Sequence, residues 1–521
     1  MKKSRLIPWI LSSTILSGLL AGCGSTATTA APTSTAAVIA LAPQTAPNWW
    51  FPITSDTAFS DLNMQMNALM YLPLVHISRH DDIDYAKSLA KTIVWNPSGT
   101  VYTITLNPQW HWSNGRPVTA KDVVWTIKMM LLASRSSTVS WNYGGAGIGG
   151  LPTSTSAGRW QSVTAPNAHT VVITLSRPSN PQWFIRNGLG QVTPVPISLW
   201  KHGTPNQTMN FIKSVSNTPQ AAPYQVVDGP FKFDAQLSKI HNQYWTFVPN
   251  PHFNGIKPQL SRVIFQYESS DSAEFSALKT GKVTVGYLPS SMWAARHQLT
   301  NDTLFMPYLF GFTFLQPNDN AQAPGGLGPV FQKAYVRQAL EMGIDQPAII
   351  HSLYHGHAIV ETGPIPPKPA TVFDDSALNS PLYPYNPAAG KKLLESHGWV
   401  LKNGVLTKGT HTLAFTVLYM SGSDTDASLM QLIQQDWAKE GVRITLKSEP
   451  FNNVLSTAQQ TDPTQWNMAF WGASSWTYEP DYYPTGGSFW MTGAGANQGG
   501  YNNQTMDRLI QASYQPGSTA Q

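Results

Sequence analysis

The order of apolar and polar residues along the chain predicts a series of strands. Residues 100–106 (TVYTITL) and 169–175 (HTVVITL) alternate β-branched with polar residues, as strands with one buried face do. Residues 442–446 and 468–470 are predicted to be strands as well. Helical segments lie between these strands, so the pattern indicates an α/β body that begins near residue 38.

Three helices are marked by the residues at their ends. Residues 119–122 (TAKD) form a capping-box pattern that opens a core-facing helix. The apolar residues on one side of that helix are Val123, Val124, Ile127, Met130 and Leu131. Asn386-Pro387 and Gly398 mark the two ends of a second helix, because proline is favoured in the first turn and glycine just past the last. A third helix over 426–440 stops at Gly441 and passes directly into a strand, which is the order expected of an α/β lobe.

The length and composition predict at least two lobes. The chain has 521 residues, whereas a single hydrophobic core stops growing at about 250 to 300 residues. Apolar residues make up 42% and charged residues only 12%, against about 25% in ordinary globular proteins. The net charge of +5 is spread thinly, and the only adjacent lysines are the pairs at 2–3 and 391–392. This pattern argues against a nucleic-acid partner.

The first residues predict a targeting segment. Lys2, Lys3 and Arg5 precede an apolar stretch at 6–20 that is too short and too rich in serine for a membrane span, so residues 1–22 are interpreted as a signal peptide that is removed. No later stretch of about 18 or more apolar residues follows, so we do not expect a channel or permease.

Cys23 is the single cysteine, and it follows Leu20-Ala21-Gly22 at the end of the apolar stretch. This segment resembles the bacterial lipobox, which implies that Cys23 is acylated and becomes the new N-terminus, anchored stably by two acyl chains. The alternative is an ordinary signal peptide with a chance cysteine. In the anchored form, residues 23–37 would be the acylated cysteine and a flexible tether of alanine, serine and threonine. Because no other cysteine occurs, disulfides and cysteine-based metal or nucleophile chemistry are excluded.

Residues 112–123 (WSNGRPVTAKDV) carry a more specific signal. With this motif and the later ones, the chain resembles the large solute-binding lipoproteins of oligopeptide and dipeptide ABC transporters, known as family 5, over about residues 69–514. The motif departs from the family only at Asn114, where aspartate is usual. Further matches follow in the family's order at 228–232, 250–253, 276–281, 336–345 and 385–387.

The resemblance implies an α/β fold with two lobes, of the periplasmic-binding-protein type II or Venus flytrap kind, with an extra subdomain on the first lobe. Its hinge would close the lobes on a solute. The expected limits are 38–75, 190–305 and 491–521 for lobe I, 76–189 for its subdomain, and 306–490 for lobe II. Family members continue past residue 521, so we expect a truncated C-terminus after a helix at 505–512.

The aromatic segment 471–483 (WGASSWTYEPDYY) follows a predicted strand and is the best candidate for the ligand site, since α/β lobes bind ligands at strand ends. In the resembling family this segment lines the cleft, and an aspartate after the tryptophan holds the peptide's amino terminus. The nearest positions here are Ser474, Ser475 and Trp476. The candidate ligand-binding residues are Phe59, Trp471, Trp476, Tyr478, Glu479 and Asp481.

Three readings of this segment stay open. Glu479 or Asp481 replaces the missing aspartate and pairs with a solute ammonium group. Alternatively, the acid is lost and a neutral solute such as an oligosaccharide stacks on Trp471 and Trp476. In the third reading the aromatic residues belong to the core and the acids to a solvated loop.

Two other patterns are interpreted as structural. Gly145, Gly147 and Gly150 fit G-x-G-x-x-G without a following helix and predict a flexible loop. The glycine- and proline-rich stretch at 321–329 predicts a surface loop. His351, His355 and His357 fall near the end of a predicted helix at 347–356, where the helix dipole favours imidazoles without a metal, although relatives of the family include nickel carriers. We therefore predict no metal or other cofactor.

The leading hypothesis is a monomeric, lipid-anchored receptor on the extracytoplasmic face of the cell membrane, at the cell surface or in the periplasm. It would deliver oligopeptides or dipeptides to the permease and ATPase subunits of an ABC importer. The second hypothesis changes the solute to an oligosaccharide or a metal chelate. The third is an anchored envelope hydrolase, but neither G-x-S-x-G nor H-E-x-x-H occurs, so no catalytic residue is predicted and an enzyme is not expected.

Overall fold

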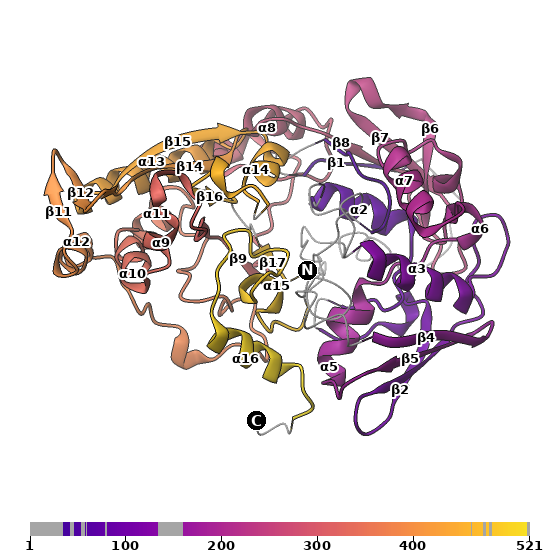
Figure 1. Cartoon of the computed structure of the whole chain (residues 1–521). Coiled ribbons are helices and arrows are strands. Elements are labelled where there is room, and N and C mark those ends of the chain that lie inside the picture. The colour runs from indigo at the N-terminus through magenta and orange to yellow at the C-terminus, as the bar shows by residue number, and fades with distance from the viewer. Residues whose placement is uncertain are drawn as a thin grey trace.

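The protein has two α/β lobes with a hinge region between them (Figure 1). The computed structural model describes residues 35–41, 46–53, 58, 60–78, 81–133, 160–459, 461–472, 476–478 and 482–517. The N-terminal half of the chain forms the lobe on the right of Figure 1, and the orange segments form the lobe on the left. This is the two-lobed fold expected from the sequence.

The first lobe is built on a mixed four-stranded sheet in the order β1-β8-β7-β6. Its strands are β1 (Ala36–Ile39), β6 (Phe231–Lys239), β7 (Tyr244–Pro249) and β8 (Arg262–Gln266). β1 runs parallel to β8, and the other two pairs are antiparallel. The Trp50 ring packs on Phe233 and Phe247 at centroid distances of 5.0 and 6.0 Å, so aromatic side chains fill the core of this sheet.

A second sheet, antiparallel throughout, forms the lower part of the same lobe in the order β2-β3-β5-β4 (Figure 1). Its strands are β2 (Ala90–Trp95), β3 (Val101–Leu106), β4 (Trp160–Asn167) and β5 (Thr170–Leu175). β3 and β5 bury alternate side chains, as their sequence pattern predicts. Helix α3 (Ala120–Ala133) packs on this sheet, and its Asp122 carboxylate accepts the Thr119 backbone N–H at 2.9 Å, which is one half of the predicted capping box.

The other helices of the first lobe surround these sheets. They are α2 (Asp61–Met70), η2 (Tyr85–Lys87), α5 (Pro181–Trp183), the π-helical turn η4 (Phe184–Gly188), η5 (Leu189–Gln191), α6 (Ile197–Trp200), α7 (Pro205–Val215), η6 (Ala222–Gln225), η7 (Ile240–Asn242), α8 (Asp271–Lys279) and η8 (Ser290–Gln298). One large hydrophobic core joins both sheets of this lobe.

The second lobe is built on a four-stranded sheet in the order β10-β16-β14-β15. Its strands are β10 (Leu315–Pro317), β14 (Ala414–Met420), β15 (Arg443–Glu449) and β16 (Met468–Phe470). β14 is parallel to both of its neighbours. Helix α13 (Asp424–Glu440) connects β14 to β15, and it starts two residues before the predicted position because Ser423 caps it.

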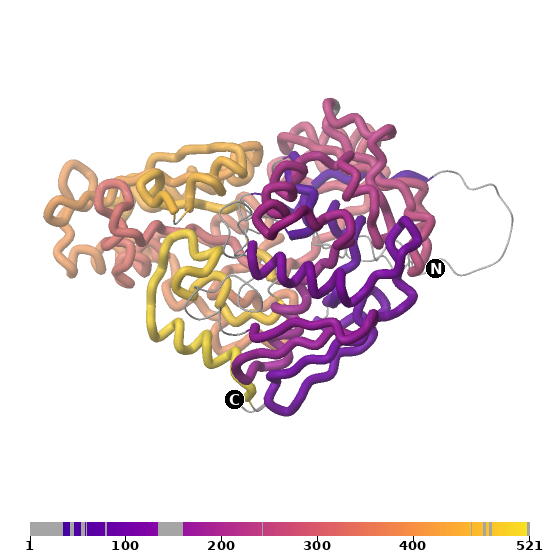
Figure 2. Tube along the Cα trace, turned by 45° about the vertical axis from the view of Figure 1, so that its right-hand side comes forward, coloured from indigo at the N-terminus to yellow at the C-terminus, as the bar shows by residue number. Residues whose placement is uncertain are grey.

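The remaining elements belong to the second lobe, to the hinge or to the C-terminal segment that returns to the first lobe. They are β9 (Gly311–Phe312), η9 (Pro324–Gly326), α9 (Gly328–Phe331), α10 (Ala334–Met342), α11 (Gln346–Ser352), η10 (Ser376–Leu378), α12 (Pro387–Ser396), β11 (Val400–Lys402), β12 (Val405–Lys408), β13 (His411–Thr412), α14 (Phe451–Thr457), η11 (Pro463–Gln465), β17 (Trp476–Thr477), α15 (Gly487–Trp490) and α16 (Gln504–Ser513). Figure 2 shows the yellow C-terminal segment returning to the first lobe, where the Tyr514 ring stacks on Trp183 at 4.1 Å.

Two predicted elements differ from the structure. The predicted loop at 321–329 contains the short helices η9 and α9, because Pro324 and Pro329 each occupy a first-turn position that favours a helix. The predicted helix at 347–356 ends already at Ser352, since the backbone turns at His355 with a φ of 52°. The glycine motif at 145–150 lies outside the described residues. None of the helices in the described part is long and apolar enough to cross a membrane.

Candidate functional site

The two chain segments that connect the lobes are tied together by a short antiparallel ribbon. Phe312 of β9 pairs with Trp476 of β17, and Gly311 pairs with Thr477. The Tyr478 backbone N–H donates to the Phe310 carbonyl at 2.9 Å, which extends the ribbon by one residue. A side chain at Gly311 would lie 2.1 Å from the Trp476 carbonyl oxygen, so this close approach of the two strands requires glycine.

Aromatic side chains surround this ribbon, and we call them the hinge cluster: Phe312, Trp476, Tyr478 and Phe489. Phe314 packs against both the hinge cluster and the small second-lobe core around Trp466. Trp490 packs against both the hinge cluster and the first-lobe core. The cluster is therefore a continuous apolar bridge between the two lobes.

Three of the ligand-binding candidates are described, and the structure places all three in or near this bridge. Trp471 is 9% exposed, and its indole N–H donates to Gln316 Oε1 at 3.1 Å. Trp476 and Tyr478 are 4% and 5% exposed, and the Tyr478 hydroxyl donates to the Pro364 carbonyl at 2.8 Å. Their rings are mostly covered by protein, so their role toward a solute stays a prediction. Phe59, Glu479 and Asp481 lie outside the described residues, as do Ser474, Ser475 and Cys23.

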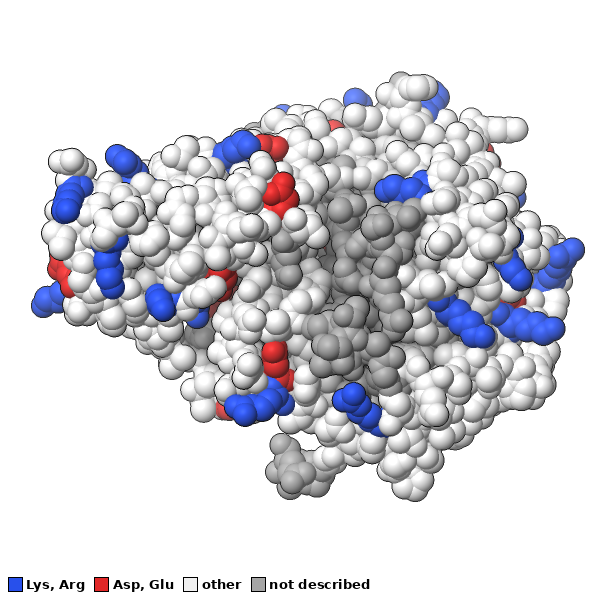
Figure 3. Space-filling view, in the orientation of Figure 1, with Lys and Arg blue, Asp and Glu red and all other residues white. Residues whose placement is uncertain are grey.

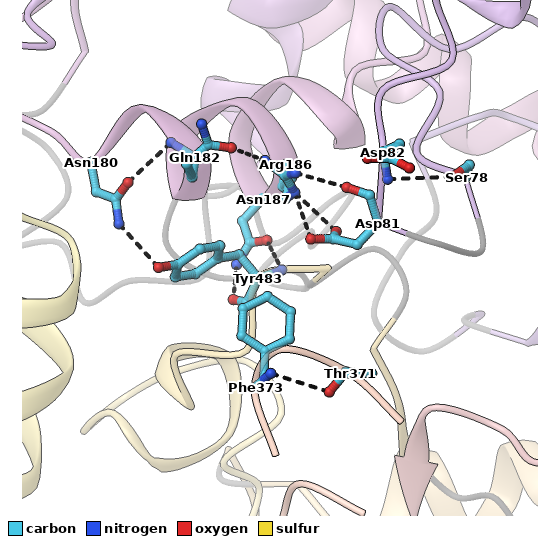
Figure 4. A network of polar contacts seen from close by, with 10 residues as sticks. All are labelled: Ser78, Asp81, Asp82, Asn180, Gln182, Arg186, Asn187, Thr371, Phe373 and Tyr483. Carbon is cyan, nitrogen blue, oxygen red and sulfur yellow. Dashed lines mark hydrogen bonds and ion pairs between the residues drawn. The ribbon is translucent and has the colours of Figure 1, made fainter. Parts of the chain in front are cut away.

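The return of the chain to the first lobe is held by a side chain that the sequence analysis did not select (Figure 4). Asn187, in the π-helical turn η4, donates its side-chain N–H to the Tyr483 carbonyl at 2.7 Å. The Tyr483 backbone N–H donates back to Asn187 Oδ1, also at 2.7 Å. The Tyr483 hydroxyl accepts from the Asn180 side chain at 3.4 Å. The Asn187 amide thus pairs with both the N–H and the carbonyl of Tyr483, as the backbone of a neighbouring β-strand would.

An ion pair fixes the turn that carries Asn187. The Arg186 Nε lies 2.9 Å from each carboxylate oxygen of Asp81, and its Nη2 donates to the Asp81 carbonyl at 2.7 Å. Arg186 also contacts Gln182 on its other side. Burial raises the pKa of the Asp81 carboxyl, while the Arg186 charge opposes that shift. This pair is half-buried and multidentate, so it orders the turn better than an exposed ion pair would.

Phe373, in the connection between α11 and α12 of the second lobe, contacts both connecting segments. Its ring stacks with Phe310 on the outgoing segment at 6.2 Å and meets the Tyr483 ring edge-on at 5.3 Å on the returning one. Its backbone N–H donates to Thr371 Oγ1 at 3.3 Å (Figure 4). Phe310 in turn packs on Tyr478 at 4.5 Å. These aromatic contacts link the two connecting segments of the hinge to each other through Phe373.

The lobes also touch where the N-termini of helices α8 and α13 meet. Asp271 of the first lobe accepts the Asp424 backbone N–H at 3.0 Å and the Ser291 hydroxyl at 3.3 Å through the same oxygen. Its own N–H donates to the Gly422 carbonyl at 3.3 Å. Asp271 is 2% exposed, and this burial raises the pKa of its carboxyl. A carboxylate at a helix N-terminus is favourably placed toward the helix dipole, so this contact stabilises the observed arrangement of the lobes.

The histidines considered for a metal site form a third contact between the lobes. The rings of His355 and His357 pack on Trp293 of η8 at 5.6 and 4.6 Å, and His355 Nε2 lies 3.1 Å from the Ser290 carbonyl. The Arg296 guanidinium also lies over the Trp293 ring, 4.3 Å from its centroid. No group of three potential metal-ligating side chains occurs among the described residues. His355 and His357 thus pack against η8 of the first lobe.

Charge gives little further guidance to the site. On the face drawn in Figure 3, Lys and Arg side chains are spread over the outer parts of both lobes, and acidic side chains are few. Several acids are buried instead, and burial raises the pKa of Glu274, beside the α8–α13 contact, to about 8. Glu274 Oε1 accepts the Tyr287 backbone N–H at 2.6 Å.

Comparison with known proteins places the fold among binding proteins. Residues 84–492 match the bacterial extracellular solute-binding proteins, family 5. A Brucella ovis protein with the provisional name of ABC transporter peptide-binding protein is 26% identical over 385 residues, which cover 70% of this chain and 61% of that protein. The chain thus spans less than two thirds of the length of this relative.

Solved structures agree in fold. AppA, the oligopeptide-binding protein of Bacillus subtilis, solved with a nonapeptide, gives a TM-score of 0.75 at 18% identity, covering 94% of this chain and 88% of AppA. NikZ of Campylobacter jejuni, solved with Ni(L-His), gives a TM-score of 0.71 at 21% identity with the same coverage. Because the family match spans residues 84–492 and the two-lobed fold agrees with it, this chain belongs to the bacterial extracellular solute-binding proteins of family 5.

Proposed function

We propose that this chain is the extracytoplasmic receptor of an ABC importer, which captures a short peptide between its lobes and delivers it to permease and ATPase subunits. The observation that carries the proposal is the family match over residues 84–492 together with two lobes joined by two paired connections. The similarity to AppA, solved with a nonapeptide, supports a peptide as the solute.

In this proposal the hinge cluster and its ribbon form the axis about which the lobes close on the solute. The lobes turn as rigid bodies about the β9–β17 ribbon, and the solute is enclosed when both lobes contact it at once. The Trp471 to Tyr483 segment contributes aromatic surface, and Glu479 or Asp481 pairs with the ammonium group of the peptide. Phe59 contributes from the first lobe. The family consists of solute-binding proteins, so no catalytic step is proposed.

A second solute class is a metal chelate or an oligosaccharide. It is supported by the similarity to NikZ with its bound nickel–histidine complex and by the absence of an aspartate at positions 474 and 475. In that case the solute would bring its own metal ligands, and Trp471 and Trp476 would serve as stacking surfaces.

The proposal includes a lipid anchor at Cys23. The signal-like residues 1–22 would be removed and two acyl chains would hold the chain at the membrane, with residues 24–37 as the tether. Labelling of living cells with a radioactive fatty acid tests this directly. The Cys23→Ala variant should lose the label, and a label that persists in that variant would contradict the anchor.

The test of the solute is mass spectrometry of the small molecules released when the purified protein is denatured. Peptides in the eluate support the leading proposal, and calorimetric titration with the synthetic peptides found should then give saturable binding. The double variant Glu479→Gln, Asp481→Asn should weaken binding by about tenfold or more, because a buried ammonium group would lose its partner. The matched control is Asp462→Asn, on the surface of the second lobe. Release of a glycan or a metal chelate, with no peptide, would refute peptide capture.

A further inference from the structure

We propose that the Asn187 side chain is a clamp that fixes the returning hinge segment to the first lobe and thereby sets how readily the lobes open and close. Asn187 acts through Tyr483, so it is a positioning residue and does not itself touch the solute. Only the predicted effect on solute affinity rests on the proposed function; the effect on lobe motion does not.

The first step of the argument is the geometry of the clamp. Asn187 is fully buried, and its amide both donates to and accepts from the backbone of Tyr483 at 2.7 Å. Two short, well-matched hydrogen bonds from one side chain to one residue restrict both translation and rotation of that residue. Loss of the Asn187 side chain would leave both the N–H and the carbonyl of Tyr483 without these partners, which is costly for groups shielded from water.

The second step is the rigidity of the platform. The π-helical turn η4 is held by the Arg186–Asp81 pair and by the burial of Phe184 and Ile185 in the first-lobe core. π-helical turns are rare and often mark functional positions, because an inserted residue redirects one side chain. Asn187 lies in this turn, and its side chain points at the backbone of the returning segment (Figure 4).

The third step is the position of the clamp along the chain. Tyr478 belongs to the hinge cluster, whereas Tyr482 and Tyr483 pack against the first-lobe core. A side chain at Gly190 in η5, directly after the turn, would lie 3.7 Å from the Tyr482 ring, so this part of the first lobe also lies close to Tyr482. Asn187 therefore holds the residues at which the chain leaves the hinge cluster and joins the first lobe.

The fourth step links the clamp to the second lobe. The Tyr483 ring carries the edge-on contact to Phe373, which also stacks on Phe310. If Tyr483 is fixed to the first lobe, this contact is made or broken only by movement of the second lobe. A Tyr483 that is no longer held can follow Phe373, so the contact ceases to favour one lobe arrangement over another. Loss of the clamp should therefore broaden the range of lobe positions.

The test measures lobe positions without any solute. Spin labels are placed at the exposed Lys128 of the first lobe and Lys402 of the second, in the chain with Cys23→Ser, and their distance distribution is measured by electron–electron double resonance. We expect Asn187→Ala to broaden this distribution and to raise amide exchange at Tyr483 by tenfold or more. Tyr483→Phe is the matched control, since it keeps the backbone bonds and the ring and loses only the 3.4 Å contact with Asn180.

Two further variants keep the test decisive if Asn187→Ala does not fold. Asn187→Asp keeps the acceptor for the Tyr483 N–H but removes the donor to its carbonyl, and it should show the same broadening to a smaller extent. Phe373→Ala removes a partly exposed ring and should broaden the distances without changing amide exchange at Tyr483. Unchanged distances in both variants, together with unchanged amide exchange at Tyr483 in Asn187→Asp, would overturn the proposal.

The affinity arm uses alanine peptides of two to nine residues. If any of them binds the unmodified protein, Asn187→Ala should weaken it by about five- to fifty-fold, mainly through faster dissociation, while Tyr483→Phe leaves it unchanged. Binding that is equal in all three proteins would contradict the link between clamp and affinity. A complete lack of peptide binding would count against the proposed function alone, since the distance and exchange measurements decide the clamp independently.

Discussion

Replacing Glu440 by glutamine should stabilise the protein relative to the unmodified chain, and this gain in the free energy of unfolding should be larger at pH 8 than at pH 5. Glu440 is the last residue of helix α13 and is fully buried, and neither carboxyl oxygen has a hydrogen-bond partner among the described residues. Two glycines of neighbouring helices make room for it: a side chain at Gly343 would lie 2.8 Å from Glu440 Oε2, and one at Gly390 would overlap Oε1. The space thus holds a carboxyl group without solvating it.

The sign follows from the protonation states of the two forms of the chain. Burial, together with the nearby Asp436 charge, raises the pKa of Glu440 in the folded protein from 4.5 to about 8. Between these values the folded chain holds one proton more than the unfolded chain, so the free energy of unfolding falls as the pH rises through this window. The slope is at most about 1.4 kcal/mol per pH unit, which gives at most about 4 kcal/mol between pH 5 and pH 8.

Glutamine has the shape of the protonated carboxyl group and does not titrate. The Glu440→Gln variant should therefore match the unmodified protein within about 1 kcal/mol at pH 5 and exceed it by about 2–4 kcal/mol at pH 8. Urea unfolding at pH 5, 6.5 and 8 measures this, with fluorescence of Trp437 in the same helix as one of the reporters. Other buried acids, such as Glu274, contribute equally to the pH dependence of both proteins, so their contribution cancels in the difference.

The control is Glu395→Gln on helix α12, where the side chain is exposed and the same charge change should have no pH-dependent effect on stability. A Glu440→Gln effect that is constant across the three pH values would refute the reasoning, because it would mean that the carboxyl group has the same proton affinity in both states.

Two other substitutions test particular contacts. Gly229→Ala should destabilise the first lobe by about 3 kcal/mol or more, because the new methyl group would lie 2.5 Å from the Met70 carbonyl carbon. Gly363→Ala, at a position with open space around it, is the control and should have little effect. Thermal unfolding measures both. Asp271→Ala should lower the melting temperature and loosen the lobes, because the Asp424 N–H loses its acceptor. Asp271→Asn keeps an acceptor oxygen and should restore most of the stability. Equal losses in both variants would show that this hydrogen bond does not stabilise the contact between the lobes.

The fold could be predicted from the sequence where local patterns and buried faces agree. Strands β3 and β5 were predicted within one residue, because their alternating residues are buried on one side of an antiparallel sheet. The strand at 468–470 was predicted at its observed limits. Predicted helix ends were less accurate: α13 begins earlier because Ser423 caps it, and α11 ends earlier because His355 leaves the helical region.

The short helix α9 was missed because its glycine and proline residues are typical of loops. Gly328 lies so close to the Asn320 backbone that no side chain would fit, and Pro329 takes a first-turn position of the helix. The tertiary contact thus determines a structure that composition alone does not indicate.

The candidate site could be predicted only in part. The sequence located the aromatic segment that contains Trp476 and Tyr478, and the structure places both at the hinge. It did not select Asn187, whose partner Tyr483 is 296 residues away, or Asp271, whose partner Asp424 is 153 residues away. For Asn187 the one weak signal was its place close to Phe184, Ile185 and Leu189, since an asparagine buried among apolar residues needs hydrogen-bond partners. Which partners it finds depends on the assembled lobes.

The return of the C-terminal segment to the first lobe constrains the order of folding. Tyr514 completes the packing around Trp183, and the Ser513 carbonyl accepts from Asn180, 333 residues earlier in the chain. The second-lobe core, by contrast, is made from one continuous stretch of chain. Since closing a loop of several hundred residues costs entropy before any contact is gained, the second lobe can finish folding first and the first lobe must wait for helix α16. In the export that the proposed function requires, the N-terminal half would therefore stay open until α16 has crossed the membrane.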